Sequence, residues 1–187
     1  MKKNPGADED PFVAFARAAV LAWINDRKLL GWNEYADDKH RDPAIAERMK
    51  GESAGAFVSL HLHGLLRGCI GTIEPIRASL AEEISSNAVS ACSRDPRFSP
   101  VRMEELDGLE INVDILHPPV PHIGLIDWDV RRYGVIVAGR HGRRGILLPD
   151  LEGVDSAAEQ MSIAMQKAGL SSGEVENVWI FEVERHD

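Results

Sequence analysis

The chain has 187 residues, of which 44% are hydrophobic and 27% are charged, and its formal net charge is −9. These values predict one globular domain, or two small subdomains that share a core. The acidic balance argues against a protein that binds nucleic acid through bulk positive charge.

The cysteines and the hydropathy bear on the location of the protein. There are two cysteines, fewer than a disulfide scaffold needs. The N-terminus has no apolar segment of the kind found in signal peptides, and no apolar run approaches the roughly 18 residues that cross a bilayer. We therefore expect a soluble, cytoplasmic protein that does not contact a membrane.

The first part of the chain predicts a polar tail followed by a helix. Residues 1–10 are polar and are expected to be disordered. Asp10 and Pro11 suit the N-cap and the first position of a helix. Apolar residues then recur at helical spacing: Phe12, Phe15, Ala16, Ala19 and Trp23. A short helix is also expected after Pro43.

Residues 57–73 predict a β-hairpin. Apolar and polar side chains alternate over residues 57–63, as in a half-buried strand. Gly64 marks a turn, and a second strand is expected over residues 66–73. The hairpin therefore has one apolar face and one polar face.

The register of this hairpin follows from matching its apolar residues. A three-residue loop over 63–65 places Val58, Leu60 and Leu62 opposite Ile70, Gly68 and Leu66. The polar face then pairs Ser59 with Cys69 and His61 with Arg67.

The rest of the chain predicts alternating helices and strands. We expect a helix over about 77–92, strands over 109–116, 134–138 and 145–148, a helix over about 155–168 and a strand over about 176–185. The apolar stripe of the first helix is Ile76, Leu80, Ile84, Ala88 and Ala91, with Asn87 inside it. That of the second is Ala158, Met161, Met165 and Ala168.

A faint internal repeat links the two halves of the chain. The order strand, His-Gly, Arg-Gly, strand, proline and helix occurs around residues 57–92 and again about 77 residues later. In the second copy Ile146 stands where Cys69 stands in the first. An aliphatic residue thus meets the structural need at this position, and the thiol of Cys69 requires another explanation.

Four short motifs follow one another along the chain: Gly55–Leu60, Leu66–Gly71, Asp95–Pro100 and Gly145–Pro149. Together they resemble the AMMECR domain family. The prokaryotic branch called AmmeMemoRadiSam system protein A is the most similar, because of residues 148–155 and 167–170. The resemblance covers residues 12–185, nearly the whole chain.

This resemblance implies an α+β fold in which a single antiparallel sheet is built from two repeated β-rich units flanked by helices. The AMMECR-type domain would occupy residues 11–187, as one body or as two subdomains. The resemblance also implies two partners, a Memo-type protein related to class III extradiol dioxygenases and a radical SAM protein. It makes Leu66–Gly71 the hallmark segment of the family, but it supplies no established reaction.

Cys69 is the candidate catalytic residue, because a thiol becomes nucleophilic when a neighbouring Arg or protonated His lowers its pKa. Arg67 would be that cation or an anion ligand, and His61 a possible base. In the alternative interpretation Cys69 is a small, inert residue in a crowded strand.

The candidate binding residues lie in or near the same segment. Arg67 either pairs with Asp95 or Glu74 or offers its guanidinium to an anion. Gly68 and Gly71 indicate close approach of another group. Asp95 and Arg97 form a local ion pair or a binding site, and Asn87, if buried, must be hydrogen-bonded.

Other chemistries receive little support. His61, His63 and Cys69 share donor types with zinc sites, but no spacing signature accompanies them, so no metal and no cofactor is predicted. The basic run at residues 140–144 is typical of a solvated turn, with contact to RNA or an acidic partner as the alternative. Three functions stay open: an accessory or binding subunit, an enzyme that uses Cys69, and a regulator linked to nucleic acid.

Overall fold

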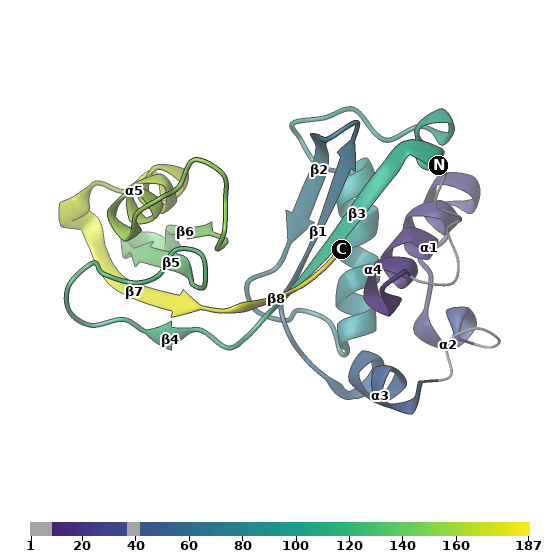
Figure 1. The fold of residues 1–187 in the computed structure, drawn as a ribbon, viewed down its shortest axis with the longest axis horizontal. Helices are drawn as coiled ribbons and strands as arrows, with labels where there is room; N and C mark the ends of the chain where they lie inside the picture. Colours follow the sequence, from purple (N-terminus) through teal and green to yellow (C-terminus); the bar gives the residue numbers. More distant parts are fainter. Residues whose placement is uncertain (1–8, 37–41) are drawn as a thin grey trace. The chain divides into compact units, whose positions relative to one another are not determined.

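The computed structural model describes residues 9–36 and 42–187, which belong to two compact units (Figure 1). Unit 1 contains the residues up to Ile115 together with Arg185–Asp187, and unit 2 contains Leu116–Glu184. Of the tail expected over residues 1–10, residues 1–8 lie outside the described part. Within that part, no helix combines the length and the apolar character needed to cross a membrane.

Unit 1 begins with helix α1 (Pro11–Asp26), which starts where the sequence predicts. The carboxylate of Asp10 accepts hydrogen bonds from the backbone N–H groups of Phe12 and Val13, at 2.8 and 3.3 Å. Such a cap satisfies donors that have no partner inside the helix. Two short helices follow, α2 (Trp32–Tyr35) and α3 (Pro43–Gly51).

The sheet of unit 1 has four strands in the order β2-β1-β3-β8. They are β1 (Ala56–Leu62), β2 (Leu65–Gly71), β3 (Leu109–Leu116) and β8 (Val183–His186), and a 3₁₀ helix (Met103–Gly108) precedes β3. Helix α4 (Leu80–Ser93) packs against β1 and β2, and α1 packs against α4. The core lies between these helices and one face of the sheet.

The β1–β2 hairpin differs from the predicted register near its turn. Val58 lies opposite Ile70, Ser59 opposite Cys69 and Leu60 opposite Gly68, as expected. Beyond that point a bulge shifts the register, so that His61 lies opposite Leu66. The predicted pairing of His61 with Arg67 is therefore wrong.

A two-residue turn at His63 and Gly64 causes this difference. Their φ angles are 55° and 75°, which is the left-handed combination of a type I′ turn. Such a turn matches the twist of the strands, and the bulge then absorbs the one extra residue of β2. The three-residue loop is thus not formed.

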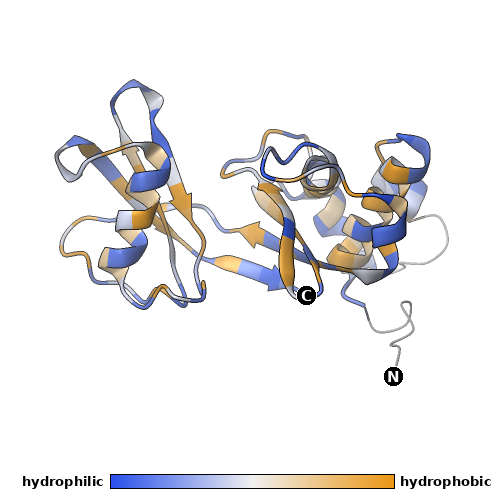
Figure 2. Ribbon diagram, turned by 90° about the horizontal axis from the view of Figure 1, so that it is seen from above, coloured by the Kyte–Doolittle hydropathy of each residue, from blue (hydrophilic) through white to orange (hydrophobic). Residues whose placement is uncertain are grey.

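Unit 2 is a second four-stranded antiparallel sheet with the order β4-β7-β5-β6. Its strands are β4 (Val120–Pro121), β5 (Gly134–Gly139), β6 (Arg144–Leu147) and β7 (Val175–Phe181). Short 3₁₀ helices lie at Arg140–Gly142 and Ser172–Glu174. Helix α5 (Ala157–Ala168) packs on β5 and β6. Figure 2 shows hydrophobic and hydrophilic residues alternating along the helices of both units, as amphipathic helices require.

The α+β class with antiparallel, helix-flanked β-rich units is confirmed, and the strands form two four-stranded sheets where a single sheet was expected. A hairpin followed by a helix recurs as β1–β2–α4 and β5–β6–α5. The repeated order read from the sequence is therefore present in the fold.

The predicted faces of the two long repeat helices need correction. Helix α4 starts at Leu80, later than expected, with Ser79 as its N-cap, and Ile76 is exposed in the preceding loop. Helix α5 buries Ala157, Gln160 and Ala164, and Ala158 is exposed. The buried face of α5 is set by its close approach to β6, which the spacing of its apolar residues does not reveal.

Candidate functional site

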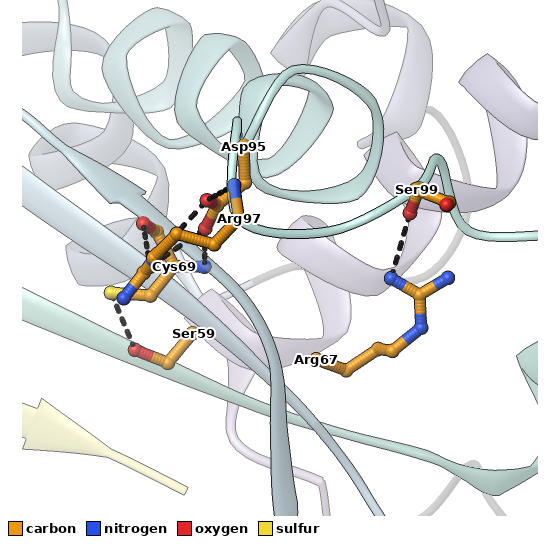
Figure 3. A network of polar contacts seen from close by, with 6 residues as sticks. All are labelled: Ser59, Arg67, Cys69, Asp95, Arg97 and Ser99. Atoms are coloured by element: carbon orange, nitrogen blue, oxygen red, sulfur yellow. Dashed lines mark hydrogen bonds and ion pairs between the residues drawn. The ribbon is translucent and has the colours of Figure 1, made fainter.

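Cys69 lies in β2, the edge strand of the unit 1 sheet, and its backbone is held by an ion pair (Figure 3). The backbone N–H of Cys69 donates to Asp95 Oδ2 at 2.9 Å, and Arg97 Nη2 donates to the carbonyl oxygen of Cys69 at 3.1 Å. Arg97 also binds the Asp95 carboxylate, at 2.7 and 3.0 Å. The ion pair thus satisfies the backbone N–H and carbonyl groups of Cys69, which a further strand would otherwise bind at this edge of the sheet.

The two groups of this ion pair stabilise each other in their charged forms. Only 4% of Asp95 is exposed. Hydrogen bonding by Arg97, helped by the N–H groups of Cys69 and Arg97, holds the pKa of Asp95 well below its usual range. The same hydrogen bond raises the pKa of Arg97. Both groups are therefore charged at neutral pH, and the expected local pairing of Asp95 with Arg97 is present.

The thiol of Cys69 lies on the polar face of the sheet. The hydroxyl of Ser59 donates to Cys69 Sγ at 3.3 Å, and the Cys69 residue is half-buried. Cys92 is the contrasting case: it is 2% exposed, and burial raises the pKa of its thiol to about 11. Of the two thiols, that of Cys69 is the one positioned to meet a reagent or a partner.

Arg67 is fully engaged inside unit 1. Its guanidinium donates to both carboxylate oxygens of Glu105, at 2.8 and 3.1 Å, and to the carbonyl oxygens of Ser99 and Pro100, at 2.8 and 3.3 Å. The expected partners Asp95 and Glu74 are thus replaced by Glu105, whose pKa is lowered by the hydrogen bonds from Arg67. Arg67 fastens the segment after α4 to the hairpin.

His61 and His63 are not assembled with Cys69. His61 lies opposite Leu66 on one side and Glu110 on the other, and His63 forms the turn. Within the described residues, Ser59 is the side chain hydrogen-bonded to the thiol, and no group of three potential metal ligands occurs.

The two glycines of the hallmark segment admit different groups. A Cβ atom on Gly68 would collide with the carbonyl oxygen of Ala91 in α4, and one on Gly71 would collide with the ring of Phe57. Gly68 therefore permits the helix to approach the core face, and Gly71 permits an aromatic ring to lie across the polar face.

A buried polar network links the hairpin to helix α4 and to the loop that precedes this helix. The amide of Asn87 donates to the carbonyl oxygen of Ala56 at 2.9 Å and to Thr72 Oγ1 at 3.3 Å. The Thr72 hydroxyl donates to Glu83 at 2.7 Å, and Glu83 also accepts from the N–H groups of Ile76 and Arg77, each at 2.9 Å. Asn87 is thus hydrogen-bonded to backbone, as a buried amide requires.

Sequence reasoning missed Glu83, which is 1% exposed. A glutamate in the first turn of a helix ordinarily faces solvent and the helix dipole. The available signal was the internal repeat, because Glu83 corresponds to Gln160, another buried polar residue. The two positions hold the loops that enter the two helices.

The basic turn of unit 2 is neutralised by its own neighbours. Arg140 pairs with Glu176 at 3.0 Å, and Arg143 pairs with Glu174 at 2.7 Å. The hydrogen bond from Arg143 lowers the pKa of Glu174 to about 2. Unit 2 also contains a cavity of about 300 Å³, lined by residues such as Tyr133 and Phe181, and none of the candidate residues lines it.

Residues 13–186 match the model of the AMMECR1 family. The chain belongs to this family. An AMMECR1 relative from Thermotoga maritima is 41% identical over 180 residues, which cover 95% of this chain and 98% of that protein.

A second AMMECR1 relative, from Clostridium acetobutylicum, is 39% identical over 96% of this chain, but the match covers only 36% of that protein. The match to a Methanothermobacter thermautotrophicus protein covers 64% of that relative. The chain thus spans about a third to nearly the whole of the relatives that it matches.

The AMMECR1 fold is also known from a crystal structure. An uncharacterized protein from Pyrococcus horikoshii is similar with a TM-score of 0.76 and 29% identity, over 93% of this chain and 88% of that one. The resemblance inferred from the four motifs is confirmed by these matches.

Proposed function

We propose that this AMMECR1 protein is an accessory or binding subunit that acts with a Memo-type protein and a radical SAM protein. The observation that carries the proposal is the Clostridium acetobutylicum relative, in which the matching sequence makes up only 36% of the chain. A domain that occurs both alone and joined to a longer polypeptide is well suited to work beside other proteins.

The geometry of the hallmark segment is consistent with such a role. Arg67, Gly68 and Gly71 are used in contacts within unit 1. The groups left facing outward are the Ser59–Cys69 pair and the guanidinium of Arg97, whose side chain is 54% exposed. We propose this surface, named here the Cys69 surface, as the contact with a partner or its substrate.

Co-expression tests the proposal. The tagged chain is produced with the Memo-type and radical SAM proteins of the same genome and analysed by size-exclusion chromatography. We expect co-elution, weakened by substitution of Cys69 with the bulky Trp and unaffected by Arg140→Ala in unit 2. Separate elution of all three proteins at micromolar concentration would reject the accessory role.

A second candidate, an enzyme that uses Cys69 as nucleophile or carrier thiol, is favoured by one observation. Arg97 binds the Cys69 carbonyl at 3.1 Å and so holds a fixed cation near the thiol. Arg97 thus occupies the place beside the thiol that the sequence suggested for Arg67. The candidate base His61 is not hydrogen-bonded to the thiol.

Alkylation and complementation test this alternative. At neutral pH we expect iodoacetamide to modify Cys69 at least about tenfold faster than Cys92, whose thiol is buried with a raised pKa. Equal, slow labelling of both thiols argues against a reactive Cys69. If a Cys69→Ala protein restores, in cells, the function that is lost when the native gene is deleted, the hypothesis of an enzyme that uses Cys69 is excluded.

A further inference from the structure

A cationic and aromatic surface lies where helices α1 and α4 end. The guanidinium carbon of Arg27 is 5.9 Å from the centroid of the Trp23 ring, and that of Arg94 is 5.5 Å from the same centroid. Both arginines are exposed, and Trp23 is half-buried. These three residues are named here the Trp23 surface. Each distance is within the range of a cation–π interaction.

The two arginines differ from most other arginines of unit 1. Six arginines hold a carboxylate within unit 1, and Arg77 bonds the hydroxyl of Ser86; the six are Arg17, Arg48, Arg67, Arg97, Arg102 and Arg185. Among residues 9–36 and 42–187, no carboxylate lies within ion-pair distance of Arg27 or Arg94. Two guanidinium groups that have no carboxylate partner in the described part of the chain therefore contact one aromatic ring, on a chain whose net charge is −9.

The backbone of Arg27 provides an independent observation. Arg27 caps the C-terminus of α1 with φ 56° and ψ 29°, in the left-handed region. Helix α5 ends in the same conformation, but there the residue is Gly169, with φ 63°. Because glycine adopts this conformation without steric cost, an arginine here is retained at the expense of backbone stability. Such a conflict points to a use for the side chain.

Local electrostatics keep both cations in place. The C-terminal ends of α1 and α4 carry partial negative charge, which favours a cation beside each. Both arginines act on the nearby Cys92, where they lower the thiol pKa against the larger effect of burial. Each guanidinium group thus lies beside the ring of Trp23 at the end of a helix.

We infer that the Trp23 surface binds an acidic segment of a partner protein, through carboxylates that pair with Arg27 and Arg94. Arginine forks match carboxylates in geometry, and tryptophan and arginine are enriched among the residues that dominate protein interfaces. The net negative charge disfavours a long polyanion such as RNA, whereas a short acidic segment needs only these two cations. The inference rests on the proposed accessory role and specifies the chemistry of the partner.

The Trp23 surface and the Cys69 surface are linked through neighbouring residues of the chain. Arg94 directly precedes Asp95, whose carboxylate holds the backbone of Cys69, and Arg97 follows.

Fluorescence anisotropy with fluorescein-labelled octaglutamate tests the inference on the full chain at low salt. We expect saturable binding that the double variant Arg27→Gln/Arg94→Gln weakens about tenfold, since two exposed charge pairs are lost. The control Arg77→Gln removes the same charge from an exposed site in unit 1, where Arg77 bonds Ser86, and should change affinity less than about twofold. Absence of binding, or equal binding by the double variant, overturns the inference.

Arg27→Gly separates a binding role from a structural one. Because glycine suits the left-handed conformation, this variant should keep or raise Tm while it weakens octaglutamate binding. A lower Tm with unchanged binding would mean that Arg27 serves the fold alone, and would overturn the inference.

Two further measurements distinguish a failure of the acidic-ligand inference from a failure of the proposed function. Tighter binding of single-stranded oligouridylate than of octaglutamate, with the same dependence on Arg27 and Arg94, would reassign the surface to nucleic acid and overturn the inference. If octaglutamate binds as expected but the Memo-type and radical SAM proteins do not co-elute, the proposed function fails and the acidic-ligand surface stands. If they co-elute with the double variant as with the native chain, the surface inference fails alone.

Discussion

The hairpin and helix β1–β2–α4 of unit 1 and their counterpart β5–β6–α5 in unit 2 solve the same packing problem with related residues. Gly68 in β2 faces the carbonyl oxygen of Ala91, and Gly145 in β6 faces that of Ala164. Ser79 and Ser156 cap the two helices through equivalent hydrogen bonds. The shared residues are thus those that bring a helix onto a hairpin.

The differences between the two copies lie in polar residues. Ser59 pairs with Cys69 in the first hairpin, and the corresponding pair in the second is Ile136 with Ile146. Likewise Glu83 in α4 corresponds to Gln160 in α5. The comparison teaches that Gly68 of the hallmark segment serves packing, whereas the Ser59–Cys69 pair is a departure specific to unit 1.

The largest expected effect comes from filling the glycine contacts. Gly68→Ala and Gly145→Ala each place a methyl group against a helix carbonyl, so each should lower the free energy of unfolding by about 3 kcal/mol. Urea unfolding followed by tryptophan fluorescence measures this. The controls Gly51→Ala and Gly173→Ala, where no atom lies within 4 Å, should be neutral. A neutral Gly145→Ala would break the comparison, because only one copy would then need its glycine.

An exchange of the two buried polar residues sharpens the comparison. Gln160 donates to the carbonyl oxygens of Tyr133 and Leu148, at 2.9 and 3.3 Å, whereas Glu83 accepts from N–H groups. Gln160→Glu would turn a carboxylate toward two acceptors and should cost about 3 kcal/mol, and Glu83→Gln about 2 kcal/mol.

Exposed neighbours are the controls for this exchange. Glu82→Gln and Gln166→Glu make the same chemical changes at the surface of the same helices and should alter stability by about 0.5 kcal/mol or less. The measurement is again urea unfolding. If the buried and exposed variants are equally stable, the two positions do not hold the entry loops as the hydrogen bonds indicate.

The Asp95–Arg97 pair predicts that the stability of unit 1 depends on pH. The pKa of Asp95 is lowered in the folded protein, mainly by the hydrogen bond from Arg97. The stabilisation that the ionised Asp95 carboxylate provides is therefore fully present above the pKa of the unfolded chain, about 3.9. It is lost as the pH falls through the pKa of Asp95 in the folded protein. Asp95→Asn should cost about 2 kcal/mol at pH 7, and the difference from the native protein should shrink below pH 4.

Unfolding experiments at a series of pH values test this prediction. In unit 2 the corresponding carbonyl oxygen, that of Ile146, accepts a hydrogen bond from Lys167 Nζ at 3.4 Å. Asp129→Asn, an exposed substitution in unit 2, is the matched control and should leave the acid dependence unchanged. A constant difference between Asp95→Asn and the native protein from pH 7 to pH 2 would contradict the prediction.

Local patterns in the sequence predicted the elements well. The Asp10-Pro11 start of α1 and the bounds of β3 at 109–116 follow from capping and alternation within a few residues. The Ser59–Cys69 pairing followed from apolar matching along two adjacent strands. These features depend on neighbours in sequence, which a single chain displays directly.

The remaining features depend on distant residues. Arg67 binds Glu105, 38 positions away, and nothing local distinguishes this carboxylate from Asp95 or Glu74. Glu83 is buried because the loop before α4 turns its N–H groups inward. The turn at His63 placed a non-glycine residue at positive φ, which apolar matching could not foresee.

The smallest expected effect on stability, and the most informative for function, is the conversion of Cys69 to the residue of the second copy. Cys69→Ile loses one weak hydrogen bond from Ser59 and gains a β-branched side chain suited to a strand, so stability should change by less than about 1 kcal/mol. Urea unfolding checks this, with Ile146→Cys as the reciprocal variant. If Cys69→Ile instead costs 3 kcal/mol or more by the scale of core overpacking, the thiol is required for packing. If the Cys69→Ile protein is stable but cannot replace the native protein in cells, the cysteine that distinguishes the first copy from the second is needed for function.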